Sequence, residues 1–377
     1  MLKVKRYLER KISVDIKKGK ILIIFGARQV GKTTLVKELL DAPDSLYING
    51  DFIDDQNRLG EPSRAMVDSF RNTKILVIDE AQRIKDIGIK LKVIHDTLPD
   101  ITIVATGSSS FELSNTINEP LTGRTIERTM FPLSISEIGQ EKSINFSEIL
   151  VYGLYPAVFT ASSIEEKKEK IEFIASQYLF KDVLNIEYIK NPKSLEQLLL
   201  LLAEQVGSEV STNELSNTLN IDAKTVEKYL DILEKLFIVF PLHPYYKNKR
   251  KSISKKRKYY FYDIGIRNAL VGDFTSIVER KDLGALWENF CIVERIKRNA
   301  ELERKPRYHF WRSYAGEEID FIEVINQKLY GFECKFAKGI IDPKIQKKYK
   351  EELFGEGSVK IVNTDNSMDF FEDKYDK

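Results

Sequence analysis

Cysteine and histidine are scarce in this chain of 377 residues, which contains two cysteines and three histidines. Cys291 and Cys334 are too few for a disulfide framework or a cysteine-based metal site. His95, His243 and His309 are scattered along the sequence, and we assign them no metal role. This composition predicts a reduced, cytoplasmic compartment.

Long hydrophobic runs are also absent. The strongest apolar run, Leu198–Ala203, is too short to cross a bilayer and lies in a polar, helix-like segment. Residues Met1–Lys20 are charged throughout and lack the apolar core of a signal peptide. With 42% hydrophobic and 31% charged residues, the chain is expected to be a soluble globular protein of two or three domains, without a membrane partner.

Neither sign of charge predominates overall, because 59 basic residues nearly cancel 57 acidic ones and leave a net charge of +2. Locally, residues 247–258 are strongly basic, with lysine or arginine at positions 247, 249, 250, 251, 255, 256, 257 and 258. Such a run is suited to the phosphate backbone of a nucleic acid. A solvated loop explains it equally well.

The most informative motif is a phosphate-binding loop. It follows the apolar segment Ile21–Phe25 and leads into a helix-like segment, Thr34–Leu40. Its glycines let successive backbone N–H groups turn toward phosphate oxygens, and the helix start adds a partial positive charge. We expect Lys32 to reach the β- and γ-phosphates of a nucleoside triphosphate and the Thr33 hydroxyl to hold Mg²⁺. The predicted nucleotide-binding residues are Gly26, Ala27, Arg28, Gln29, Val30, Gly31, Lys32, Thr33 and Thr34.

Strand-like segments alternate with helix-like ones through the first third of the chain. This alternation predicts a parallel sheet that is covered on both faces. The predicted strands are Ile21–Phe25, Ser45–Ile48, Ile75–Ile78, Ile101–Ala105 and Thr125–Met130.

Acidic and hydroxyl side chains follow two of these strands. Asp79 could ligand Mg²⁺ through water, and Glu80 is placed to orient or deprotonate the attacking water. Thr106 and Ser108–Ser110 follow the next strand, at the edge where this kind of sheet binds its ligand. One of these hydroxyls could contact the γ-phosphate or the attacking water, or the segment could be a plain turn with a helix cap.

Arg124 is a candidate arginine finger, because a guanidinium can neutralise the charge that spreads over a transferred phosphoryl group. It could equally be a surface arginine. If it acts on a neighbouring subunit, the protein must form a homo-oligomer. Guanine recognition normally uses an Asn-Lys-x-Asp element, and the segment Asn248–Lys251 lacks the aspartate, so we expect ATP as the nucleotide.

Several of these segments together resemble one family, the prokaryotic AAA-type ATPases, close to the archaeal ATPase group, that carry a C-terminal domain of uncharacterised function. The resemblance covers nearly the whole chain and implies an ATP-binding protein. The segments that carry it are Val4–Tyr7, Gly26–Thr34, Ile78–Gln82, Thr106–Ser109, Gly123–Arg124, Phe131–Ser134, Gly153–Pro156 and Lys258–Gly265.

The middle of the chain has apolar residues at helical spacing over Ser163–Leu184 and Leu195–Gln205. Two more helices are predicted after these, Thr212–Leu219 capped by Ser211 and Ala223–Phe237 capped by Asp222. A short helix, a tight turn at Asn220-Ile221 and a longer helix are typical of a helix-turn-helix.

In that arrangement Lys224, Thr225 and Lys228 would face a DNA major groove. The strand-like segments Ile238–Leu242 and Tyr259–Tyr262 would bracket the basic run as a wing that touches backbone phosphates. Helix-turn-helix units also serve as dimerisation or lid modules, and this alternative is also consistent with the sequence.

Four charged residues stand out in the last third. Glu288 lies in a helix-like segment, Asp320 lies in or beside a strand, and Glu333 and Lys335 share one face of the strand-like run Leu329–Phe336. Such a set suits Mg²⁺-dependent phosphodiester cleavage. Asp320 and Glu333 would ligand the ion, Glu288 would complete the coordination, and Lys335 would activate water or stabilise the pentavalent phosphate.

The order of these four residues resembles the restriction-endonuclease-like fold, whose motif is written PD-(D/E)XK. Ile319 stands where the motif has its proline, which weakens the match. The alternative is a domain that keeps the scaffold and binds DNA or protein without cutting.

Together these features predict an α/β protein of four parts. They are a P-loop AAA-type ATPase domain (1–135), a helical lid (136–190), a winged-helix-like domain (191–262) and a smaller nuclease-like α/β domain (263–377). The expected function is a Mg²⁺-dependent ATPase that couples ATP hydrolysis to a DNA-binding C-terminal half. An ATP-gated nuclease proper, and an ATP-dependent signalling or assembly switch with an inert nuclease-like domain, are the alternatives.

Overall fold

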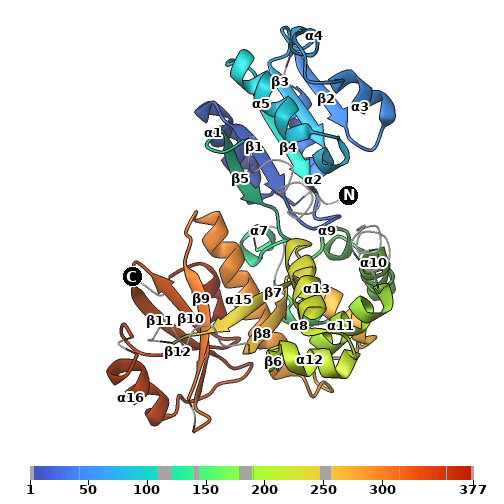
Figure 1. The fold of residues 1–377 in the computed structure, drawn as a ribbon. Helices are drawn as coiled ribbons and strands as arrows, with labels where there is room; N and C mark the ends of the chain where they lie inside the picture. Colours follow the sequence, from blue (N-terminus) through green and yellow to red (C-terminus); the bar gives the residue numbers. More distant parts are fainter. Residues whose placement is uncertain are drawn as a thin grey trace. The chain divides into compact units, whose positions relative to one another are not determined.

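The computed structural model describes residues 4–41, 43–107, 121–139, 144–177, 189, 191–246, 256–313, 315–353 and 355–374 (Figure 1). The chain divides into two compact units. One contains residues 2–132 together with 235–237, and the other contains residues 133–234 and 238–377.

The first unit is built on a five-stranded parallel sheet with the order β2-β3-β4-β1-β5, which confirms the predicted parallel sheet (Figure 1). Each strand begins and ends within two residues of the segment predicted from its apolar pattern. In this order β4 lies between β1 and β3, so its carboxyl end lies beside both the phosphate loop and the acidic pair. The strands are β1 (Ile21–Phe25), β2 (Ser45–Asn49), β3 (Ile75–Asp79), β4 (Thr102–Gly107) and β5 (Thr125–Thr129).

The core of this unit explains why β1 is apolar without alternation. All five residues of β1 are buried, because both faces of the strand are covered. Ile21 and Ile23 belong to one large apolar cluster that also contains Leu91 and Ile94 of α5. The helices are α1 (Tyr7–Asp15), α2 (Lys32–Lys37), α3 (Ile53–Leu59), α4 (Arg64–Asp68) and α5 (Ile87–Thr97), with short 3₁₀ turns at Ile16–Lys18, Glu38–Asp41 and Ala81–Arg83.

The second unit combines helices with a seven-stranded mixed sheet of order β12-β11-β10-β9-β7-β8-β6. The strands are β6 (Glu209–Ser211), β7 (Val239–Pro244), β8 (Lys256–Phe261), β9 (Arg307–Arg312), β10 (Glu318–Ile325), β11 (Lys328–Cys334) and β12 (Lys360–Val362). The helices are α7 (Ile135–Ile138), α8 (Phe146–Tyr152), α9 (Pro156–Phe159), α10 (Ile164–Gln177), α11 (Pro192–Glu204), α12 (Thr212–Leu219), α13 (Ala223–Lys235), α14 (Ile264–Val271), α15 (Leu283–Glu301), α16 (Pro343–Glu351) and α17 (Ser367–Phe371).

The two predicted short helices of the middle segment are present as α12 and α13. The hydroxyl of Ser211 accepts a hydrogen bond from the Glu214 N–H at 3.2 Å and so caps α12. Asn220 ends this helix in the left-handed conformation with φ of 52°. The last part of the helix predicted over Ser163–Leu184, and residues 247–255 of the basic run, lie outside the described residues.

Strand β7 joins two regions that sequence patterns placed in separate domains. It pairs antiparallel with β8 and parallel with β9, where His243 lies opposite His309. The hairpin that brackets the basic run is therefore part of the same sheet as the strands that carry Asp320 and Glu333. Among the helices of the described residues, none is long and apolar enough to cross a membrane.

Candidate nucleotide-binding site and acidic cluster

The phosphate loop packs closely against the chain that leaves β5. A side-chain carbon at Gly26 would lie 2.2 Å from the Met130 carbonyl oxygen, so the first position of the loop accepts only glycine. The side chains of Ala27 and Val30 are buried and anchor the loop. The ammonium of Lys32, also buried, donates to the carbonyls of Gly26 and Ala27 at 2.8 Å each. The helix that follows, α2, is shorter than predicted and continues as a 3₁₀ turn.

Three hydroxyl groups converge on the carboxylate of Asp79. Thr33 Oγ1 and the phenol of Tyr47 both donate to its Oδ2, at 2.7 and 2.8 Å, and Thr106 Oγ1 donates to Oδ1. Strands β2, β3 and β4 are neighbours; Asp79 and Thr106 lie at the carboxyl ends of β3 and β4, and Tyr47 reaches Asp79 from the middle of β2. Burial and the hydrogen bond to Asp79 raise the pKa of Tyr47, which keeps its phenol protonated as a donor.

Glu80 follows Asp79 in a left-handed backbone conformation with φ of 50°. This conformation costs a non-glycine residue about 1 kcal/mol and is common at functional sites. The Glu80 N–H donates to Thr106 Oγ1 at 3.2 Å, and Gln82 Nε2 donates to the Glu80 carboxylate at 2.5 Å. A side-chain carbon at Gly50 would lie 2.3 Å from the Glu80 carbonyl oxygen, so the turn is enclosed tightly on that side.

Arg6, just before α1, contacts both the phosphate loop and the segment that follows β5. Its guanidinium donates to the carbonyl of Val30 at 2.5 Å and to that of Phe131 at 2.6 Å. In the sequence, Arg6 could be identified only as part of a family resemblance, because a hydrogen bond to a loop carbonyl leaves no sequence signal. Tyr47 was also missed, since an aromatic residue in a strand is usually a packing residue.

Arg124 lies away from the phosphate loop of its own chain. Its carbonyl accepts a hydrogen bond from the Ile21 N–H at 2.9 Å, at the start of β1, whereas the loop follows the end of β1. A five-residue strand spans about 16 Å. The guanidinium instead pairs with Asp96 at 2.8 and 3.0 Å. Any role as an arginine finger would therefore have to be on another subunit. Ser108–Ser110 lie outside the described residues.

These side chains fit a magnesium–nucleotide complex. A buried lysine at the loop supplies the positive charge that phosphates require, and Mg²⁺ prefers oxygen ligands such as the Thr33 hydroxyl and the Asp79 carboxylate. Thr33 would hold the ion directly, and Asp79 would hold it through water.

The acidic cluster of the second unit consists of Glu288 on α15, Glu318 and Asp320 on β10, and Glu333 on β11. Burial, and then the charge of Asp320, raise the pKa of both Glu288 and Glu333 to about 7. Burial also raises the pKa of Asp320, whose Oδ2 accepts a hydrogen bond from the Cys334 N–H at 2.9 Å.

Lys335 lies at the outer side of this cluster. It is 49% exposed, and its ammonium lies 3.1 Å from Glu333 Oε2. Asp320 lies close enough to Glu288 and Glu333 for its charge to raise the pKa of both, and Lys335 pairs with Glu333. Over the described ranges, however, no group of three acidic, cysteine or histidine side chains is arranged to hold a metal ion. The ammonium of Lys258 lies among the carboxylates instead, 3.1 Å from Glu288 Oε1. The carboxylates as arranged therefore do not fit a divalent cation.

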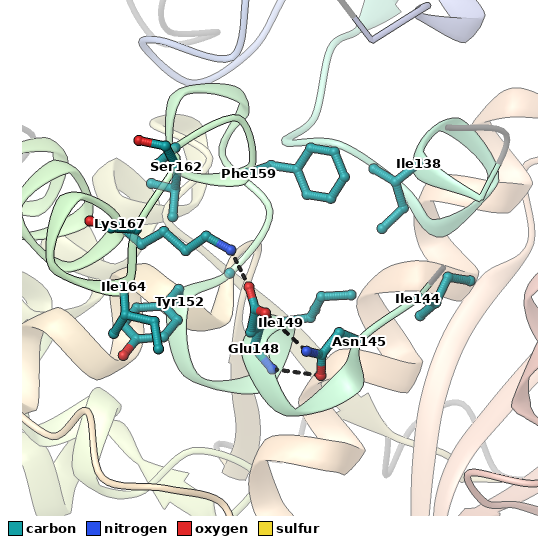
Figure 2. Close-up of a pocket in the computed structure, with 14 residues that line it drawn as sticks. Ile138, Ile144, Asn145, Glu148, Ile149, Tyr152, Phe159, Ser162, Ile164 and Lys167 are labelled. Carbon is teal, nitrogen blue, oxygen red and sulfur yellow. Dashed lines mark hydrogen bonds and ion pairs between the residues drawn. The ribbon is translucent and has the colours of Figure 1, made fainter. Parts of the chain in front are cut away.

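A cavity of about 340 Å³ lies between the helices of residues 138–167. Figure 2 shows Lys167 pointing toward Glu148, with which it forms an ion pair, and Asn145 donating to the same carboxylate at 2.9 Å. The remaining wall is largely apolar, with Ile138 and Ile149 among its residues. Among the described residues that line the cavity, the one lysine, Lys167, is paired with Glu148, so this wall offers no free cation for a phosphate.

Comparisons with known families divide the chain into three matched segments. Residues 18–139 match the family described as "AAA domain". Residues 143–276 and 283–374 match two families described as domains of unknown function, DUF8612 and DUF4143. The first match contains the whole phosphate loop and strand β3, which ends in Asp79.

Similar proteins occur in bacteria and archaea. An uncharacterised protein of Mycobacterium tuberculosis is 27% identical over 339 residues, which cover 89% of this chain and 74% of that protein. An uncharacterised protein of Methanocaldococcus jannaschii is 25% identical over 348 residues, covering 84% of this chain and 75% of that one.

Among solved structures, the fold is similar to that of the Walker-type ATPase PABY2304 of Pyrococcus abyssi, with a TM-score of 0.51 and 14% identity. The similarity covers 70% of this chain and 94% of the other. The family match and this shared fold support, for the first unit, a P-loop ATPase domain of the AAA, Walker type.

Proposed function

We propose that this protein is a Mg²⁺-dependent ATPase whose hydrolysis of ATP controls a C-terminal half that binds duplex DNA without cutting it. The observation that carries the ATPase proposal is the 2.7 Å hydrogen bond between Thr33 and Asp79, directly beside the buried Lys32. A hydroxyl and a carboxylate in contact, next to a lysine on a phosphate loop, form the minimal set for a magnesium–triphosphate complex.

Each residue has a distinct role in this proposal. Lys32 exchanges the carbonyls of Gly26 and Ala27 for the β- and γ-phosphate oxygens. Bound Mg²⁺ neutralises charge on the phosphates. Glu80 orients the attacking water, and Thr106 fixes Glu80 through its backbone N–H.

The direct test replaces Lys32. Lys32→Ala is expected to abolish ATP binding or turnover, because it removes the buried ammonium that lies at the loop carbonyls of Gly26 and Ala27, where the phosphates would bind. Lys20→Ala, at an exposed position just before β1, serves as the matched control and should keep full activity. Unchanged turnover in Lys32→Ala would refute the ATPase proposal.

The DNA-binding part of the proposal is supported by the element order α11-β6-α12-α13-β7-β8, in which β6, β8 and β7 pair antiparallel at one end of the mixed sheet. This is the order of a winged helix. Val226 and Leu230 bury one face of α13, which leaves Lys224 and Lys228 exposed near its start. The basic run, which includes residues 256–257 of β8, would contact backbone phosphates as the wing.

Titration of a fluorescent DNA duplex, followed by anisotropy, tests this part. Reversing the charges of Lys249, Arg250 and Lys251 is expected to weaken binding and to reduce its dependence on salt. Absence of DNA binding at low salt, or equal DNA affinity of the wild type and the charge-reversed variant, would contradict the proposal. Mg²⁺-dependent cleavage that is lost in Asp320→Ala and Lys335→Ala would instead establish a nuclease.

A second candidate function is an ATP-dependent assembly switch that involves no nucleic acid. The exposed face of α13 favours it, because Glu227 lies between Lys224 and Lys228 and gives that face mixed charge. Arg124 also favours it, since its guanidinium could reach a nucleotide only on a neighbour. Light scattering with and without a non-hydrolysable ATP analogue would support the switch if the mass changes while DNA binding is absent.

A further inference from the structure

A buried lysine lies inside the acidic cluster. The side chain of Lys258 is 4% exposed, and its ammonium is 3.1 Å from Glu288 Oε1 and also forms an ion pair with Glu318. The ring of Phe310 lies 5.4 Å from the ammonium, measured to the ring centroid, and covers another side of it. A buried ammonium is tolerated only with such partners, so these contacts hold Lys258 in place.

The surroundings keep this lysine charged. Burial alone would lower its pKa, but the charges of Glu288, Glu318 and Asp320 outweigh burial and raise the pKa above its usual value. Tyr260, two residues along β8 and therefore on the same face, donates to Glu288 Oε1 at 2.5 Å. Strand β8 thus supplies both a cation and a hydroxyl donor to the one carboxylate.

We propose that Lys258 is the resident cation of the acidic cluster and occupies the position that a divalent metal ion takes in a metal-dependent phosphodiesterase. The proposal deepens, and rests on, the non-cutting role assigned above to the C-terminal half. Glu288 directs its Oε1 toward both Lys258 and Tyr260, so this oxygen is not available as a metal ligand.

The remaining pair of the cluster, Glu333 and Lys335, also combines a carboxylate with an ammonium group. Glu333 is buried, its Oε1 has no hydrogen-bond partner, and its Oε2 pairs with Lys335. The ammonium groups of Lys258 and Lys335 thus each lie against a carboxylate of the cluster, which offsets part of the negative charge that would attract a divalent ion.

Sensitised terbium luminescence can test the proposal at this cluster. Tb³⁺ binds oxygen ligands as hard divalent ions do, and its emission rises when a nearby tryptophan transfers energy to it. The chain has two tryptophans, Trp287 and Trp311. Trp287 precedes Glu288, and Trp311 pairs in the sheet with Ile319, next to Asp320. Residues 2–132, which include the phosphate loop, contain no tryptophan.

The wild-type protein and Lys258→Gln would be titrated with Tb³⁺ at about pH 8, above the pKa of about 7 of Glu288 and Glu333. The wild type is expected to give no saturable emission. Lys258→Gln is expected to gain it, with affinity at least about tenfold tighter, since a unit positive charge is removed from a buried site. Lys256→Gln, on the same strand with its side chain 65% exposed, is the matched control and should resemble the wild type.

Three results would overturn the proposal. They are equal Tb³⁺ affinity in the wild type and Lys258→Gln, no gain of emission in folded Lys258→Gln, and wild-type emission that Glu288→Gln abolishes. If Lys258→Gln does not fold, the comparison of wild-type emission with that of Glu288→Gln tests the proposal. Lys258→Arg, which keeps the charge, should also give no saturable Tb³⁺ emission. None of these readouts depends on ATP, so the proposal can fail while the ATPase proposal stands.

Discussion

The phenol of Tyr47 and the hydroxyl of Thr33 donate to the same oxygen of Asp79, at 2.8 and 2.7 Å. One carboxylate oxygen is therefore shared between the residue that would hold Mg²⁺ and an aromatic residue from the neighbouring strand. This relationship makes Tyr47 a positioning residue for the proposed metal site, because it fixes the rotamer of Asp79 before the nucleotide binds.

Tyr47→Phe removes this hydrogen bond and keeps the ring. Loss of one such bond is worth about 1 kcal/mol, or roughly fivefold. We expect the Mg²⁺ concentration for half-maximal ATPase activity to rise by about that factor, with ATP binding nearly unchanged. A magnesium titration of turnover measures this, and Tyr246→Phe at a partly exposed position is the control. Equal magnesium dependence in all three proteins would contradict the assigned role.

Gly26→Ala is expected to abolish nucleotide binding, because its new methyl group would lie 2.2 Å from the Met130 carbonyl oxygen and force the loop away from β5. Calorimetric titration with ATP measures the loss. Gly284→Ala is a suitable control, since an added methyl there meets no atom within 4 Å. Normal ATP affinity in Gly26→Ala would show that the loop tolerates a shift.

Arg124→Ala should leave the turnover of the dilute, monomeric protein unchanged, because Arg124 pairs with Asp96 at the opposite end of β1 from the phosphate loop. If the arginine acts on a neighbouring subunit, wild-type turnover will rise with protein concentration, by about 10³-fold in full assembly, and the variant will not follow. Turnover measured across protein concentration decides this. An equal loss of activity at every concentration, including the lowest, would place the arginine at its own nucleotide.

Gly153→Ala is expected to destabilise the second unit by about 2–4 kcal/mol. The added carbon would lie 2.0 Å from Asp263 Oδ1, and Gly153 has a φ of 77°. Asp263 cannot move aside easily, because it accepts hydrogen bonds from the Leu154 and Gly265 N–H groups at 2.7 and 2.9 Å. Gly272→Ala has a similar φ of 69° and open space, so it should cost only about 1 kcal/mol. Denaturant unfolding of both variants measures the difference.

The stability of the second unit should fall as the pH rises toward neutrality. The pKa of Glu288 in the folded protein is about 7, above its usual 4.5, so the folded state binds this proton more tightly than the unfolded state does. The resulting stability is complete below about pH 4.5 and is lost as the pH rises through 7. Glu288→Gln should flatten this dependence, and the exposed Glu279→Gln should not.

Denaturation midpoints between about pH 5 and 8, followed by the fluorescence of Trp287 and Trp311, measure the effect in this unit alone. A wild type whose midpoint is constant over this range would contradict the assignment of Glu288 as a buried acid with a raised pKa.

Local sequence patterns predicted the first unit well, because its central strands β1, β3 and β4 are buried on both faces and so appear as continuous apolar runs. The phosphate loop and the acids Asp79 and Glu80 could be found for the same reason, since each follows such a run at fixed spacing. Tyr47, Arg6 and the actual position of Arg124 could not be found, because they depend on strand order and on contacts to backbone carbonyls.

In the second unit the sequence by itself determined the helices α12 and α13, through their caps and apolar spacing, and the elements that carry Glu288, Asp320 and Glu333. Only the tertiary structure decided that the β7–β8 hairpin shares one sheet with β10 and β11, the strands that carry Asp320 and Glu333. The pairing of β7 with β9 joins them. That pairing places Lys258, 30 residues before Glu288, between Glu288 and Glu318. A lysine in a basic run is expected in solvent, and only neighbouring carboxylates in the folded chain make its burial favourable.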